Sequence, residues 1–154
     1  MKLTIFVSAL ALAGSTSAVA ADKLGESCTG TETVQVGAQA AKTTPYIIAL
    51  SVDLEAKSYC YDKCGSDETY AISDSSSNPI QLANLHDGGQ ERVLTFDRRT
   101  ATLTDFQSFD PGLGRVVRRA SAQCRAAAFH EPAKNAGSLD HSIPTFIPHH
   151  TMFR

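Results

Sequence analysis

Cysteine offers the clearest chemistry in this chain, which contains Cys28, Cys60, Cys64 and Cys124. An even set of cysteines in a short chain predicts two disulfides, although spacing alone leaves the connectivity open. We favour Cys60 with Cys64, which can close a tight turn, and Cys28 with Cys124, which can join the first strand to the last. A redox dithiol usually has two residues between its cysteines, whereas Cys60 and Cys64 have three and lie in a strand-like segment. A zinc site is disfavoured because Cys28 and Cys124 have no histidine close by.

Histidine suggests a second chemistry, the binding of a divalent metal ion. Neutral imidazoles suit zinc, copper or nickel, and the candidate ligands are His141, His149 and His150 near the end of the chain. The alternative is an arm that is merely polar. His86 beside Asp87 could form a base with an orienting acid, but its position in a predicted turn implies no pocket.

Two pairs of neighbouring arginines, Arg98-Arg99 and Arg118-Arg119, could bind an anionic ligand if the fold brought them together. The alternative is scattered surface charge. The whole chain has a formal net charge of -2 at pH 7, which does not favour nucleic acid or an anionic lipid surface as the main partner. We therefore expect no nucleic-acid partner.

The motifs that usually mark an enzyme are missing from the sequence. It contains no G-x-S-x-G elbow, no H-E-x-x-H helix and no phosphate-binding glycine loop. We expect no catalytic residue and no cofactor, and an unknown protein or small molecule as the partner. The leading hypothesis is a binding module, such as an inhibitor or an envelope accessory protein. The alternatives are a small-molecule carrier with a barrel lumen lined by Tyr46, Ile48 and Leu50, and an enzyme whose histidine and carboxylate come from different strands.

The start of the chain has the pattern of an export signal. Lys2 supplies a positive charge, residues 3–14 form an apolar run too short for a stable membrane anchor, and small residues follow. Cleavage is expected near Ala20 or Ala21, which places the mature chain in the periplasm or outside the cell, without a membrane span. The predicted organisation is a monomer with three parts: a signal peptide (1–21), one disulfide-stapled β domain (22–132) and a flexible tail (133–154).

Alternation of polar and apolar residues dominates the mature chain and indicates β-strands. The period of two is clearest in residues 46–53 and recurs in later segments, with turn-forming residues between them. The expected strands are 32–36, 46–53, 58–61, 69–73, 80–83, 92–96 and 101–106. We predict a mostly β fold: a single antiparallel meander, small barrel or sandwich of about seven or eight short strands.

Residues 115–129 fit two different structures. As a strand they place Val116, Ala120 and Cys124 on one face, whereas the many alanines also fit a helix. We favour a strand as far as Cys124, because a hairpin-like connection precedes it and a final strand brings Cys124 beside Cys28. A C-terminal helix is the alternative.

Several short features together resemble small exported bacterial proteins of uncharacterised function. They are a strand ending in Asp53-Leu54, an aromatic residue followed by the Cys60 to Cys64 pair, an Asp97-Arg98 step that opens a hairpin, and a late Cys124 followed by Phe129 and Pro132. The similarity covers residues 46–132. Such proteins are expected to have glycine where this chain has Ala101. The resemblance implies no activity.

Overall fold

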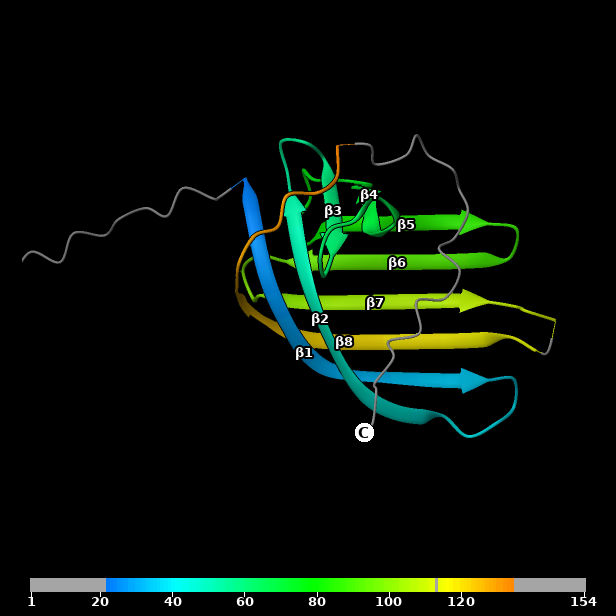
Figure 1. Cartoon of the computed structure of the whole chain (residues 1–154). Helices are drawn as coiled ribbons and strands as arrows, with labels where there is room; N and C mark the ends of the chain where they lie inside the picture. Colours follow the sequence, from blue (N-terminus) through cyan, green and yellow to red (C-terminus); the bar gives the residue numbers. More distant parts are fainter. Residues whose placement is uncertain (1–21, 113, 135–154) are drawn as a thin grey trace, which may run out of the picture.

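Antiparallel strands form one continuous eight-stranded sheet in the computed structural model, which describes residues 22–112 and 114–134. The sheet order is β4-β3-β2-β1-β8-β7-β6-β5, so the first strand pairs with the last (Figure 1). A 3-10 helix, η1 (Ser66–Glu68), precedes β4. The predicted meander or barrel of seven or eight strands is confirmed. The strands are β1 (Lys23–Val36), β2 (Lys42–Asp53), β3 (Ser58–Tyr61), β4 (Thr69–Ala71), β5 (Ile80–Asp87), β6 (Gln90–Asp97), β7 (Thr102–Phe109) and β8 (Val116–Ala126).

The segment that fitted both a strand and a helix is the strand β8. It pairs with β1 along one edge and with β7 along the other, so its backbone groups find partners on both sides. Its buried residues also alternate, as in Ala120, Ala122 and Cys124. The alternative of a C-terminal helix in residues 115–129 is therefore wrong, because pairing on both edges outweighs the helix propensity of the alanines.

The two ends of the sheet order, β4 and β5, meet and nearly close the sheet into a barrel. Asp74 and Gln81 each donate a backbone N–H to the carbonyl oxygen of the other at 2.9 Å. The Ser73 N–H also donates to the Leu82 carbonyl oxygen at 3.2 Å. This short contact covers part of the edge that an open sheet would leave unpaired.

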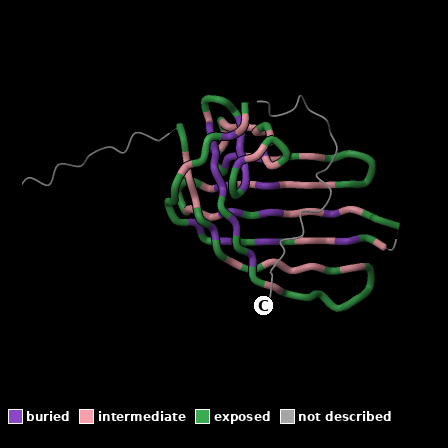
Figure 2. The backbone as a smooth tube through the Cα atoms, in the orientation of Figure 1, coloured by how far each residue is buried: buried purple, intermediate pink, exposed green. Residues whose placement is uncertain are grey.

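Side chains alternate between the interior of the barrel and its outer surface. Along β2, Tyr46, Ile48 and Leu50 are buried, whereas Ile47 between them is 64% exposed. Most buried residues lie in one half of the barrel (Figure 2). This half consists of β3, the second halves of β2, β6 and β8, and the first halves of β5 and β7. The core there is filled by Cys28, Tyr46, Ile48, Leu50, Val52, Tyr59, Tyr61, Ile80, Leu82, Leu94, Phe96, Leu103, Ala120, Ala122 and Cys124.

β1 is longer than the sequence pattern indicated, since it begins at Lys23 and not near residue 32. The part before residue 32 contains two glycines and a buried cysteine among mostly polar residues, so it lacks a clean apolar alternation. It is extended because β2 and β8 supply hydrogen-bond partners along both of its edges. Tertiary pairing therefore decided where this strand starts.

Gly30 lets β1, which curves strongly along its length (Figure 1), approach β8 closely. A Cβ atom at Gly30 would lie 1.9 Å from the carbonyl oxygen of Ser121 and 2.6 Å from the Cα atom of Ala122. Both atoms belong to the backbone of the paired strand, so neither can move aside without disturbing the ladder. Only glycine fits here.

We predict that Gly30→Ala destabilises the protein by about 2–3 kcal/mol, because the added methyl group must push β1 and β8 apart. The matched control is Gly65→Ala, since Gly65 has a φ of −62° and its Cβ would meet only side-chain ends, Asp67 Oδ1 at 3.0 Å and Glu68 Oε2 at 3.8 Å. Urea unfolding should show a loss below about 1 kcal/mol for this control. Equal losses in the two variants would contradict the role given to Gly30.

Candidate functional site

Both predicted disulfides are present. Cys28 and Cys124 are bonded and are direct partners in the register of β1 and β8, with Cα atoms 3.9 Å apart. Cys60 and Cys64 are bonded across the turn that follows β3. All of these cysteines are buried, and none is free. Two disulfides are consistent with an oxidising compartment.

The chain that follows β8, residues 127–134, crosses the outer side of β1 and β2 and reaches β4, and we call it the strap. Its backbone N–H groups donate to the strands at three points: Ala127 to Gly25 O at 2.8 Å, His130 to Ser51 Oγ at 3.0 Å, and Ala133 to Thr69 Oγ1 at 3.2 Å. The strap therefore includes Ala133 and Lys134, the first two residues of the segment predicted to be a flexible tail (133–154). Residues 135–154 and the predicted leader lie outside the described residues.

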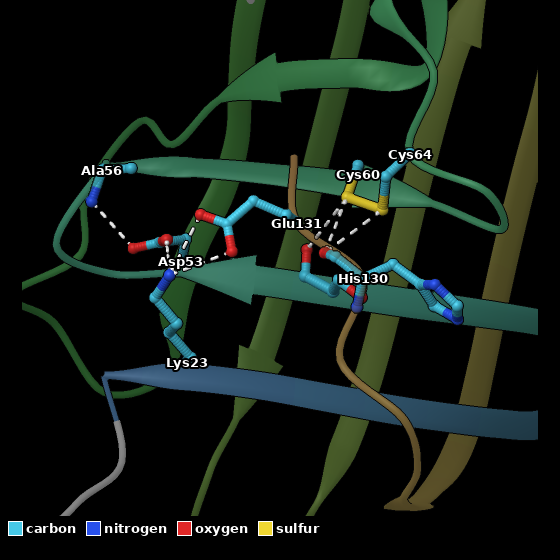
Figure 3. Close-up of polar contacts among 8 residues, drawn as sticks. Lys23, Asp53, Ala56, Cys60, Cys64, His130 and Glu131 are labelled. Carbon is cyan, nitrogen blue, oxygen red and sulfur yellow. Dashed lines mark hydrogen bonds and ion pairs between the residues drawn. A yellow bond between two sulfur atoms is a disulfide. The ribbon is translucent and has the colours of Figure 1, made fainter. Parts of the chain in front are cut away.

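The strap also covers the short disulfide (Figure 3). The carbonyl oxygen of His130 lies 3.8 Å from Cys60 Sγ and 3.5 Å from Cys64 Sγ. Cys60 is fully buried beneath it. This position fits a structural bridge, because a reactive thiol pair needs access to solvent.

Lys23 fastens the strap electrostatically (Figure 3). Its ammonium nitrogen lies 3.2 Å from Asp53 Oδ2 and 3.0 Å from Glu131 Oε1, and it also lies over the Phe129 ring at 5.2 Å. Burial by itself would raise the pKa of the Asp53 carboxyl. The Ala56 N–H and the Lys23 ammonium outweigh that effect and hold this pKa below its ordinary value.

A row of interior polar side chains, which we call the polar belt, connects β3 to β1 through β6, β7 and β8. Arg92 donates to Tyr61 Oη at 2.8 Å and to Asp105 Oδ2 at 3.2 Å. Gln107 donates to the same Asp105 oxygen at 3.0 Å. Arg118 donates to Gln107 Oε1 at 3.5 Å and, through its Nε, to Glu32 Oε1 at 2.9 Å. The members of the belt are Glu32, Tyr61, Arg92, Asp105, Gln107 and Arg118.

The charges of the polar belt compensate one another. Each arginine contacts a carboxylate, Arg92 with Asp105 and Arg118 with Glu32. Burial alone would lower the pKa of the Arg92 guanidinium, but neighbouring Tyr61 and Asp105 raise it well above its ordinary value. Arg92 therefore stays charged inside the barrel and depends on its partners. Such a neutral network suits internal support better than the capture of an ion.

Tyrosine rings pack around this charged group. Tyr59 and Tyr61 meet edge to face with centroids 5.6 Å apart, and Tyr70 lies 5.4 Å from Tyr59. Burial raises the pKa of Tyr59 to about 12, so its hydroxyl stays protonated at neutral pH. The rings shield the Arg92 contacts from water, which strengthens the hydrogen bonds inside.

The two arginine pairs proposed from the sequence occupy three different places. Arg118 faces the interior and belongs to the polar belt. Arg119, the next residue, is exposed on the opposite side of β8 and lies over the Phe106 ring at 5.2 Å. Arg98 and Arg99 are exposed in the turn between β6 and β7. The four residues do not form one patch, because successive residues of a strand point to opposite faces.

Arg125, and not Arg118, lies on the outward side of β8 together with Arg119. It is exposed on β8, six residues after Arg119 and therefore on the same side of the strand. Arg125 has no arginine next to it in the sequence, so the search for adjacent arginine pairs did not include it. The two-residue period of β8, had it been followed past Cys124, would have found it.

We call the outward-facing residues of β7, β8, β1 and β2 that lie beyond the strap the outer face. In the register, Thr104 pairs with Ser121, which pairs with Thr31 on its other side, so hydroxyl groups lie side by side across three strands. Asp and Glu are absent from these positions, all of which are described. The outer face consists of Thr102, Thr104, Phe106, Val117, Arg119, Ser121, Gln123, Arg125, Ser27, Thr29, Thr31, Thr33, Gln35, Thr43, Pro45, Ile47 and Ala49.

The predicted histidine chemistry finds little geometric support. His141, His149 and His150 lie outside the described residues. His86 is exposed, and its Nδ1 lies 3.7 Å from Glu91 Oε1, so its nearest acid is not Asp87. It borders an open depression at the β5–β6 turn. Among residues 22–112 and 114–134, no three His, Cys, Asp or Glu side chains form a possible metal site, and no helix is long and apolar enough to cross a bilayer.

We predict that acid weakens the attachment of the strap. A carboxyl with a lowered pKa in the folded state stabilises that state above its unfolded pKa, near 4, and the contribution is lost as the pH falls through the folded pKa. Asp53→Asn should therefore lower stability at pH 7 and flatten the loss between pH 5 and pH 2. Urea unfolding across this pH range measures both effects. Asp62→Asn, at an exposed turn position, is the control, and an identical profile in both variants would refute the prediction.

We predict strong coupling between Arg92 and Asp105. Replacing either one alone, as Arg92→Met or Asp105→Leu, strands a buried charge and should cost about 3–5 kcal/mol. The double replacement should cost less than either single one, because Arg92 Nε and Asp105 Oδ1 already lack hydrogen-bond partners and the pair is incompletely compensated. Urea unfolding of the full double-mutant cycle tests this, and additive losses would show that the pair is not coupled.

Comparisons with known proteins were made for the whole chain. No family model, no curated protein and no solved structure matches it.

Proposed function

We propose that this chain is a non-catalytic binding module that works in an oxidising compartment and recognises its partner through the outer face. Its predicted leader, cut near Ala20 or Ala21, would deliver it to the periplasm or outside the cell. Buried disulfides suit such a compartment. The proposal assigns the barrel to support and the surface to recognition.

The observation that carries this proposal is the composition of the outer face. The chain as a whole holds 16 acidic residues, yet none of them stands on the outer face. Asp53, the acidic residue on the outward side of β2, is buried beside the strap and paired with Lys23. Solvated protein surfaces usually mix charges of both signs. A face made of hydroxyls, amides, small apolar groups and arginine can instead form directed hydrogen bonds with a partner.

The interior offers less to a ligand. The residues that would line the lumen of a carrier, Tyr46, Ile48 and Leu50, are packed in the core with at most 5% of their surface exposed. A carrier needs an internal cavity, so this packing supports surface recognition over transport. The polar belt likewise uses its charges internally.

Retention by the envelope fraction of the producing cell tests the proposal. The purified protein should remain with washed envelopes, and the variant carrying Ile47→Glu and Ser121→Glu should be released at least tenfold more readily. Both positions are exposed on the outer face and are not cross-strand partners. Added carboxylates there would repel acceptor groups and cost desolvation on docking.

The matched control is the variant carrying Ala56→Glu and Ser66→Glu, which adds the same charge at exposed positions away from the outer face. It should be retained like the wild type. Equal release of both variants, or no retention of the wild type, would refute the proposed surface. Thermal unfolding of each variant checks that its fold is intact.

A further inference from the structure

Exposed arginines border and cross the outer face, and none of them forms an ion pair within 4 Å among the described residues. Arg119 and Arg125 project from β8, and Arg98 and Arg99 from the β6–β7 turn. The ion pairs formed by the described residues involve Lys23, His86, Arg92 and Arg118 as the basic partners. Arg99 is attracted by the neighbouring Asp97, and Arg119 lies over the Phe106 ring, but all four side chains are exposed and can reach an anion from outside.

The β6–β7 turn lies beside the second half of β8. Gln123 Nε2 donates to Thr100 O at 2.8 Å and to Ala101 O at 3.0 Å, and the Cys124 N–H donates to Ala101 O at 2.8 Å. Arg98 and Arg99 therefore lie near the same end of the face as Arg125. The turn is held in shape by Asp97, whose carboxylate accepts the Arg99 N–H at 2.8 Å.

These arginines form a line and not a single point. Arg119 and Arg125 are six residues apart on one strand, which corresponds to about 20 Å. A small anion could contact only one end of such a line. A polymer with regularly spaced negative groups can contact both ends at once and gain affinity from the linked contacts.

The groups between the arginines suit a carbohydrate. Ser121 and Gln123 lie between Arg119 and Arg125 on β8, with Thr29 and Thr31 beside them on β1. The hydroxyl groups can donate to and accept from sugar hydroxyls, and the Gln123 amide, whose Nε2 donates to the β6–β7 turn, can still accept through its Oε1. Single-stranded nucleic acid would instead need aromatic rings on which to stack, and Phe106, the aromatic residue of this face, lies under Arg119.

We infer that the outer face binds an acidic polysaccharide, with Arg98, Arg99, Arg119 and Arg125 pairing with its carboxylate or sulfate groups and the hydroxyl row contacting its sugars. This inference rests on the proposed function and names the class of its ligand. The chain has a net charge of -2, so binding to a polyanion must come from a local surface and not from overall attraction.

Heparin and polygalacturonate serve as the sulfated and carboxylated probes. The purified protein should bind at least one of them, with an affinity that falls as salt rises. The variant with Arg98→Gln, Arg99→Gln, Arg119→Gln and Arg125→Gln should bind at least tenfold more weakly in isothermal titration calorimetry. Uncharged dextran should not bind.

The matched control replaces four exposed lysines away from the arginine line, Lys42→Gln, Lys57→Gln, Lys63→Gln and Lys134→Gln, and so removes the same charge. It should bind like the wild type. Equal loss in both variants, or no binding to either probe, would overturn the inference. Tighter binding to phosphatidylglycerol vesicles or to single-stranded DNA would also overturn it.

The two proposals fail separately. If neither polysaccharide binds but envelope retention still depends on Ile47 and Ser121, the outer face is a recognition surface for another partner. The opposite result is that the polysaccharides bind and the arginine variant loses this binding, but the variant carrying Ile47→Glu and Ser121→Glu is retained by envelopes like the wild type. In that case the cellular role proposed above is wrong.

Discussion

The pairing of β1 with β8 is the constraint on which the rest of the structure depends. It joins the first and last strands of the chain, and the Cys28–Cys124 bridge holds two directly opposed residues near one end of this pairing. This bridge spans 96 positions of the sequence, and on the loop-entropy account a loop of that length stabilises the fold by about 4–5 kcal/mol. Gly30 makes the same pairing possible, because its missing side chain lets the backbones come close.

Once that register is set, the face of the sheet on which each side chain of β1 and β8 lies is also determined. Cys28 and Cys124 face inward, so Arg118 also faces inward and meets Glu32, whereas Arg119 faces outward over Phe106. The interior charges are then compensated inside the polar belt. The outward arginines form no ion pair among the described residues. The arginines inside the barrel therefore support the fold, whereas those on its outer side are accessible to a partner.

The strap divides the outer surface of the barrel. It covers the outward side of β2 around Ser51 and Asp53 and buries the Cys60–Cys64 bridge, so these polar groups are used within the protein. The earlier part of β2, with Ile47, lies beyond the strap and stays exposed. The recognition surface proposed for this protein is the part of the sheet that the strap leaves open.

The sequence by itself determined the strand content and the number of disulfides, because a period of two and an even cysteine count are properties of the chain alone. It also favoured the right cysteine pairs and the strand β8. Only the tertiary structure decided that Arg92 contacts Asp105, that Arg118 and Arg119 lie on opposite faces of the sheet, and that Arg125 is exposed on the same face as Arg119. It also decided where the strap lies. Those outcomes depend on the register between strands that are distant in sequence, and register follows from the packing of the whole barrel.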